Sequence, residues 1–302
     1  MISVTVTISL LLGCAGVEKS FVTTRPTKLN VTSTHKDLIS LPAPQEKIVV
    51  GVYKFQDQTG QFKPKENATS FSTAVTQGGT SMLMKALVDS GWFIPAEREG
   101  LPNLLNERKI IQSTLMQNAS ENGGMVQNLP PLLFSSILME GGIISYETNV
   151  VTGGLGAEYF GVGGKAETRR DQVTIYLRAV SVKNGQVVAN VSTTKAILSQ
   201  QIGFSLFRYI SYQRLLEAEM GVSTNEPPQM AVLEAIERAV IELIVQGIRD
   251  GLWNLKNPED MENEVIQRYI LMQEGLEVDQ NGELIVQKDA NGQKEKRFTL
   301  KR

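Results

Sequence analysis

Hydrophobic residues recur along most of the chain in two periods, one typical of strands and one typical of helices. Strands are predicted where apolar and polar residues alternate or where short apolar runs occur: 47–55, 92–95, 132–146, 173–182 and 186–194. Helices are predicted where apolar residues lie three and four apart: 72–88, 101–116 and 230–252. Gly141 and Gly142 are expected to break the strand that contains them. Strands interspersed with helices predict an α/β domain with a mixed sheet over residues 46–256.

Two further segments, residues 150–170 and 200–224, are unusual for a soluble domain because they combine period two with many glycines or with acidic residues. In the second, a tip is expected at residues 207–209. One face of its arms is apolar: Ile202, Phe204, Leu206, Leu216, Ala218, Met220 and Val222. The opposite face is polar: Gln201, Ser205, Glu217 and Glu219. Each arm holds roughly ten residues, the length of a transmembrane β-strand.

These segments favour two readings equally. Either both are hairpins that enter a membrane, with the apolar face toward lipid and the polar face toward a lumen, or both are surface hairpins of a soluble domain. An amphipathic helix over residues 209–220 is a further alternative. Four strands alone cannot close a barrel in lipid, because the open edges would leave backbone groups unpaired. A membrane role therefore implies a ring to which each subunit contributes two hairpins.

The N-terminus carries the pattern of a lipoprotein signal peptide. An apolar run ends in Leu11-Leu12-Gly13-Cys14, which predicts a lipoprotein signal peptide and lipobox over residues 1–14, with cleavage before Cys14 and lipidation of that cysteine. Residues 1–7 lack the usual positive charge, so the start codon is open to question. Ala15 follows the cysteine, which favours the outer membrane over the inner one. Residues 15–45 are rich in Thr, Ser, Pro and Lys and are expected to form an extended arm.

Composition argues against several other classes of protein. The 30 basic and 32 acidic residues are nearly balanced, unlike the basic excess of a nucleic-acid-binding protein. One cysteine and one histidine allow neither an internal disulfide nor a usual Cys/His metal site. The glycines of residues 153–164 match no phosphate-binding motif, and no cofactor is expected. Residues 257–302 are polar and are predicted to form a flexible tail.

An enzyme is also disfavoured. A catalytic triad would have to use His35, which lies in a polar, turn-rich stretch. The best carboxylate candidates are Glu97, Glu99 and Glu107. They are better explained as a solvated entry to a helix, with arginines 98 and 108 as their partners.

Several long motifs occur in a fixed order along the chain: DQTGQFKP at 57–64, FSTAV at 71–75, WFIPAEREGLPNLLNERKII at 92–111, GGLGAEYFG at 153–161, YQRLLEAE at 212–219 and GLWNL at 251–255. Over residues 41–257 the chain resembles the CsgG family of curli production assembly/transport proteins. The resemblance implies a lipidated outer-membrane protein with a periplasmic α/β domain. It also implies two hairpins per subunit that complete a large barrel in a ring of about nine subunits.

The resemblance further implies a function. The family secretes unfolded curli amyloid subunits without nucleotide hydrolysis, together with a periplasmic and a surface-exposed accessory factor, and it is not an enzyme. Its pore narrows at a loop that corresponds here to Lys65, Glu66, Asn67, Ala68, Thr69, Ser70 and Phe71. Phe71 matches the family pattern, whereas Ser70 replaces an asparagine, Lys65 lies near the place of a missing tyrosine, and the loop is longer. The alternative is a lipidated periplasmic binding or assembly module without a pore.

Overall fold

The structure is a computed structural model that describes residues 32–62, 73–122, 128–153, 166–202, 206–210, 227–274, 277–278 and 284–285. All of them belong to the second of two units in the chain, Thr32–Arg302. At the outer ends of the long strands, residues 149–153, 166–169, 198–202 and 206–210, only the backbone is described.

Six strands form one mixed sheet in the order β2-β1-β3-β4-β5-β6. Their bounds are β1 Ile48–Asp57, β2 Phe93–Glu97, β3 Ile137–Gly153, β4 Ala166–Ser181, β5 Val187–Ile202 and β6 Leu206–Ile210. Strand β1 is parallel to β2 and β3, and the remaining neighbours are antiparallel. Parallel neighbours require a crossover. Helix α2 (Gly79–Asp89) lies between β1 and β2 in the chain, and helix α3 (Leu101–Asn122) lies between β2 and β3. The predicted α/β domain with a mixed sheet is confirmed.

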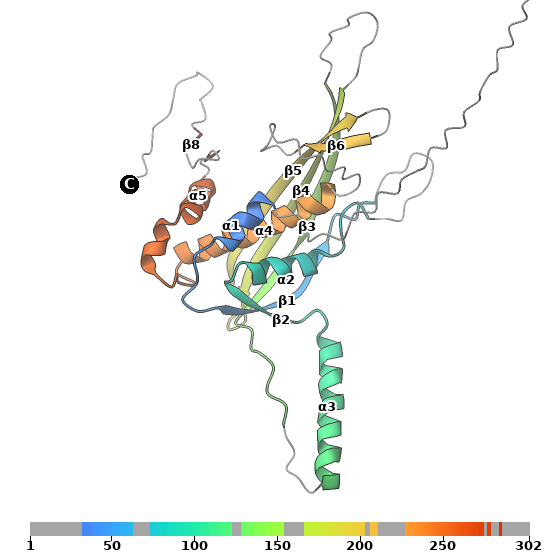
Figure 1. The fold of residues 1–302 in the computed structure, drawn as a ribbon, viewed down its shortest axis with the longest axis vertical. Coiled ribbons are helices and arrows are strands. Elements are labelled where there is room, and N and C mark those ends of the chain that lie inside the picture. The colour runs from blue at the N-terminus through green and yellow to red at the C-terminus, as the bar shows by residue number, and fades with distance from the viewer. Residues whose placement is uncertain are drawn as a thin grey trace, which may run out of the picture. The chain divides into compact units, whose positions relative to one another are not determined.

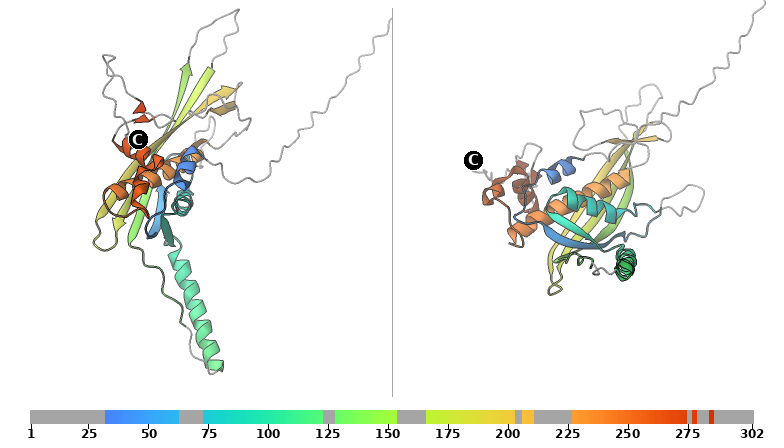
Figure 2. Two further views of the ribbon diagram at one scale, coloured as in Figure 1. Left: turned by 60° about the vertical axis from the view of Figure 1, so that its left-hand side comes forward. Right: turned by 60° about the horizontal axis from the view of Figure 1, so that its bottom comes forward.

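Helix α4 (Pro227–Arg249) and helix α2 lie on one face of the sheet (Figures 1 and 2). The strands meet them with every second side chain, as Val173, Ile175 and Leu177 of β4 show, each fully buried. Helix α4 is buried on nearly all sides over residues 231–245, because α1 (Ser33–Ile39), α2 and α5 (Glu264–Gln273) also contact it. The apolar stripe predicted for residues 230–252 is thus wider than one helix face.

The buried ring of Phe55 explains one of the two adjacent glycines of β3, Gly141. Strand β3 runs unbroken through Gly141 and Gly142, so the predicted break is wrong. A methyl group on Gly141 would lie 2.4 Å from the carbonyl oxygen of Tyr176 and 2.7 Å from the Phe55 ring. Phe55 is itself turned into the core by a register shift in β1, which places Val52 and Phe55 on the same buried side. The glycine at 141 is therefore needed for packing and does not end the strand.

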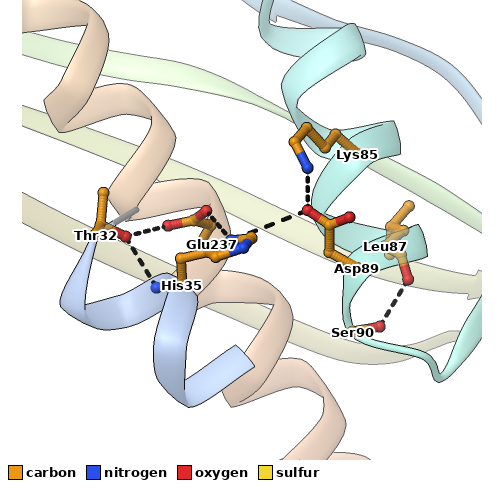
Figure 3. Close-up of polar contacts among 7 residues, drawn as sticks. All are labelled: Thr32, His35, Lys85, Leu87, Asp89, Ser90 and Glu237. Atoms are coloured by element: carbon orange, nitrogen blue, oxygen red, sulfur yellow. Dashed lines mark hydrogen bonds and ion pairs between the residues drawn. The ribbon is translucent and has the colours of Figure 1, made fainter. Parts of the chain in front are cut away.

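Helix α1 folds part of the segment that was expected to be an extended arm. Leu38 is fully buried, and the hydroxyl of Thr32 caps the helix by accepting a hydrogen bond from the backbone N–H of His35 at 2.9 Å. The same hydroxyl donates to Glu237 of α4 at 2.7 Å (Figure 3). Residues 32–45 are therefore part of the folded domain, which corrects the predicted bounds of the arm.

The predicted flexible tail also begins with folded structure. A 3-10 helix, η1 (Pro258–Glu262), leads into α5, whose Val265, Ile266 and Tyr269 are buried. Arg268 donates to Asp37 of α1 at 2.8 Å, so both ends of the described domain are joined. Strands β7 (Glu277–Val278) and β8 (Leu284–Ile285) pair with each other. Residues 257–274 thus belong to the domain, a correction to the expectation of a tail that starts at residue 257.

Candidate functional site

The loop that the family resemblance marks as a pore constriction, residues 65–71, lies outside the described residues, but both of its flanks are described. On the incoming side Phe62 follows the end of β1, and on the outgoing side Thr73 precedes α2. These two residues form an antiparallel bridge, and the backbone N–H of Ala74 donates to the carbonyl of Gln61 at 2.8 Å. The two flanks of residues 63–72, which themselves lie outside the described part, therefore meet at one place on the domain.

Side-chain hydrogen bonds also join the two flanks of residues 63–72, and the sequence did not predict them. The described flanks, residues 57–62 and 73–77, form the base of the loop. The Asp57 carboxylate ends β1 and accepts hydrogen bonds from the backbone N–H of Thr59 at 2.8 Å and from its hydroxyl at 2.7 Å. The other oxygen of Asp57 accepts from the side-chain amide of Gln77 at 3.2 Å. A sequence signal was present, because Asp followed by Thr two residues later, next to Gly60, is typical of an Asx turn.

Helix α2 begins at Gly79, with Gly78 at its N-cap, whereas the sequence pattern predicts a start near residue 72. Residues 73–78 instead continue the return path from the loop. This difference matters for Phe71. A hydrophobic residue that staples the first turn of a helix occupies the position before the N-cap, which here is Gln77.

At the two described ends of the first predicted hairpin, residues 150–153 pair antiparallel with residues 166–169. Strands β3 and β4 remain paired beyond the core as far as Gly153 and Ala166, and the intervening residues 154–165 lie outside the described part. Where these strands leave the core, the buried Asp171 accepts hydrogen bonds from the hydroxyls of Tyr146 at 3.1 Å and Thr148 at 2.8 Å. The described strands thus extend the sheet of the domain without interruption.

The second predicted hairpin turns earlier than expected. Strand β6 pairs antiparallel with β5, and Ile202 is opposite Leu206. Residues 207–209 therefore lie within a strand, so the predicted tip at that place is wrong. Among the residues predicted to face lipid or lumen, Gln201, Ile202 and Leu206 have a described backbone. The remaining residues of these two sets lie outside the described part: Phe204, Ser205, Leu216, Glu217, Ala218, Glu219, Met220 and Val222. Cys14 also lies outside it.

Of the three carboxylates considered for catalysis, Glu97 and Glu99 make separate local contacts and Glu107 is exposed on α3. Glu97 accepts from the backbone N–H of Gly100 at 2.6 Å, and Glu99 accepts from the hydroxyl of Thr80 at 3.3 Å. Arg98 donates to the carbonyl of Leu133 at 2.9 Å, which attaches the segment before β3 to the end of β2. Its role is therefore not limited to pairing with these glutamates.

The hydroxyl, imidazole and carboxylate around α1 do not have the geometry of a catalytic triad. Both Thr32 and His35 contact the same carboxylate, that of Glu237, at 2.7 and 2.9 Å (Figure 3). In a triad the imidazole lies between the hydroxyl and the carboxylate. Burial raises the pKa of the Glu237 carboxyl, and the hydrogen bonds from Thr32 and His35 partly offset that rise. Within the described residues, no group of three or more His, Cys, Asp or Glu side chains is placed to hold a metal ion.

A hollow of about 520 Å³ lies on the sheet, next to the start of α3. Its lining includes Tyr53, Gln58 and Tyr176, and the amide of Gln58 donates to the Tyr176 hydroxyl at 3.2 Å. Beside it Arg178 forms an ion pair with Glu140 at 2.6 Å, and this hydrogen bond and charge raise the pKa of the Arg178 guanidinium. Among the described helices, none combines the length and the hydrophobicity needed to cross a membrane.

The architecture defines a class of protein: a mixed α/β domain in whose single sheet β3 pairs antiparallel with β4, and β5 with β6. A sequence model of the family "Curli production assembly/transport component CsgG" matches residues 31–272. The component of that name from Salmonella typhimurium is 49% identical over 249 residues, which cover 81% of this chain and 88% of that protein. Its counterpart from Escherichia coli K12 is 47% identical over 268 residues, covering 87% of this chain and 94% of that protein. The chain therefore belongs to the CsgG family of curli production assembly/transport components.

Similarity to solved structures is weak by comparison. The protein XCC0632 from Xanthomonas campestris overlays with a TM-score of 0.30 at 14% identity, over 70% of this chain and 94% of that one. A score this low supports no conclusion, so family membership rests on the sequence matches.

Proposed function

We propose that the chain is a subunit of a ring-shaped outer-membrane channel that exports unfolded curli subunits without nucleotide hydrolysis. The observation that carries the proposal is the extension of one sheet by two antiparallel strand pairs, β3–β4 and β5–β6, in a chain of the CsgG family. The names of its relatives, which are curli production assembly/transport components, support the cargo.

The ring follows from the hydrogen-bonding needs of a barrel. Two hairpins give four strands, and an open four-stranded sheet would leave backbone groups unpaired in lipid. About nine subunits would supply about 36 strands, within the range of known barrels. In such a ring the apolar set from Ile202 to Val222 faces lipid, and Gln201, Ser205, Glu217 and Glu219 face the lumen. A lipid on Cys14 anchors each subunit to the outer membrane from the periplasmic side.

In this ring residues 65–71 form the constriction, and Phe71 provides an apolar collar. The base of the loop supports this proposal, because the bridge between Phe62 and Thr73 holds the two flanks of residues 63–72 together. The competing role for Phe71 as a staple of α2 is disfavoured, because Gln77 occupies the staple position. An apolar collar lets an extended chain slide without strong binding and restricts folded proteins. The partners of the ring are the curli subunits, a periplasmic accessory factor and a surface accessory factor.

Single-channel recording in planar bilayers tests the collar. Phe71→Ala should raise the conductance of each ring while the yield of rings stays the same. Phe134→Ala is the matched control, because Phe134 is 88% exposed and lies outside the loop, so its loss should leave conductance unchanged. If well-assembled Phe71→Ala rings conduct as the unaltered chain does, Phe71 does not form the constriction.

A second candidate is a lipidated periplasmic binding module without a pore, which the hollow lined by Tyr53 and Tyr176 favours. The two functions differ in whether residues 200–224 enter a bilayer. Formation of rings that requires detergent supports the channel, whereas a monomer that is stable without detergent supports the binding module.

A further inference from the structure

The DQTGQ stretch, residues 57–61, contributes to the family resemblance, and the proposed constriction does not explain why these residues are present. In the structure its first residue, Asp57, lies between the two flanks of residues 63–72. One carboxylate oxygen accepts from Thr59 on the incoming flank, and the other accepts from Gln77 on the outgoing flank. One rigid, planar group therefore holds both flanks.

The position of Asp57 relative to the sheet is itself fixed. Asp57 is opposite Ile143 of β3, and the backbone N–H of the next residue, Gln58, donates to the carbonyl of Ile143 at 2.9 Å. Strand β1 lies between two parallel neighbours, β2 and β3, in the sheet. The Asp57 carboxylate is thus attached to one of the inner strands of the domain.

Hydrogen bonds continue from this carboxylate along both flanks. On the incoming side the Thr59 hydroxyl accepts from the backbone N–H of Gln61 at 3.2 Å. On the outgoing side the Gln77 amide also donates to the carbonyl of Val75 at 3.4 Å, and the Thr73 hydroxyl donates to that carbonyl at 2.9 Å. Both series of hydrogen bonds therefore end beside the Phe62–Thr73 bridge that joins the two flanks.

The bridge and the carboxylate do different things. The bridge between Phe62 and Thr73 joins the two flanks to each other, which sets the width of the base. It does not by itself fix the angle at which the base leaves the sheet. We propose that Asp57 is a positioning residue that fixes this angle and so sets how far the constriction reaches into the pore. The inference rests on the proposed channel function.

A purely structural role for Asp57 predicts a different outcome from a positioning role. Asp57 is half-buried and Gln77 is exposed, so water replaces part of the lost bonding when either is changed. The domain is therefore expected to fold and assemble without the carboxylate, while the base of the loop moves. Repetition around a ring would turn a small change of angle in each subunit into a change of the opening.

Recordings on detergent-purified, full-length rings test the positioning role. Asp57→Ala should give the usual yield of rings with a shifted mean conductance and a wider spread between rings. Gln77→Ala, which releases the outgoing flank alone, should give a smaller shift. Asp57→Asn should restore most of the behaviour, because its carbonyl still accepts from Thr59 and the Gln77 amide can turn to accept from its new N–H. Asp250→Asn, at an exposed position directly after α4, is the control for lost charge.

Hydrogen exchange on the same particles provides a readout that does not depend on a pore. Without the carboxylate, amides of residues 59–62 and 73–77 should exchange at least about tenfold faster, since hydrogen bonds to a charged group are lost, while α2 is unaffected. Unchanged conductance and unchanged exchange in Asp57→Ala would both contradict the positioning role. If the unaltered chain forms no conducting ring, the channel function fails, and unchanged exchange at the two flanks would then still refute Asp57 as the residue that holds them.

Discussion

Replacing Gly247 with alanine has two opposing effects on the stability of the domain: a gain in helix propensity and a steric clash. The structure indicates that the clash is the larger effect. Gly247 lies in α4 directly beneath the ring of Trp253. A methyl group at this position would lie 2.0 Å from Cζ2 and 2.1 Å from Cε2 of that ring. Non-bonded carbon atoms prefer separations of about 3.5–4.0 Å. The ring or the helix must therefore move by more than about 1 Å.

The indole has little freedom to move. Trp253 is 7% exposed, its Nε1 donates to the carbonyl of Ile244 at 2.8 Å, and its ring meets Phe93 edge-on with centroids 5.9 Å apart. Alanine favours a helix over glycine by about 1 kcal/mol. Overpacking costs about 1–3 kcal/mol, and loss of the buried hydrogen bond costs about 1–3 kcal/mol more. We expect Gly247→Ala to lower the free energy of unfolding by about 3 kcal/mol.

Urea denaturation of the detergent-solubilised chain, followed by far-ultraviolet circular dichroism, measures this change. The matched background is Trp253→Ala, which removes the clashing ring. There the sign should reverse, so that Gly247→Ala stabilises the chain by about 1 kcal/mol through helix propensity alone. A Gly247→Ala variant that is as stable as the unaltered chain, or one that destabilises both backgrounds equally, would refute the packing argument.

Three further predictions concern charge and the membrane. Because burial raises the pKa of Glu237, its contribution to stability is present below the ordinary pKa of a glutamate, about 4.3, and is lost as the pH rises through the raised value. Glu237→Gln should remove that loss in urea titrations as the pH rises above about 4.3, and an unchanged pH dependence would contradict this explanation. Met220→Lys should reduce membrane-inserted rings more than Glu219→Lys, by about 2–4 kcal/mol per subunit at the midplane, and equal effects would argue against a spanning strand. Mass spectrometry of the mature N-terminus should show an acylated Cys14, and an unmodified Met1 in membrane-extracted protein would refute lipidation.

Regular elements with many local contacts could be predicted from the sequence. The apolar stripe of α4, preceded by Pro228 and followed by Gly251, gave a helix with nearly the observed ends. Period two in residues 150–170 predicted paired strands at the two ends of this segment, where 150–153 do pair with 166–169. In both cases the signal lies in residues that are close together in the chain.

The errors arise where residues distant in the chain decide the structure. Gly141 looks like a break until Phe55 is known to occupy the space beside it. The seven residues of α1 are too short to form a stable helix alone, and Glu237, 205 residues away from Thr32, helps to hold them. The base of the loop was not predicted for the same reason. Gln77 is 20 residues from Asp57 in the chain, and only the folded structure brings the two side chains together.

The proposed channel function requires that identical subunits close into a ring around a pore. An electron-microscopic image of the full-length chain, extracted from membranes in detergent, tests it most directly. The expected particles are closed rings with a central opening and about nine-fold symmetry, each subunit adding four strands to one barrel. Discrete single subunits or compact particles without an opening, obtained from correctly folded and lipidated protein, would contradict it.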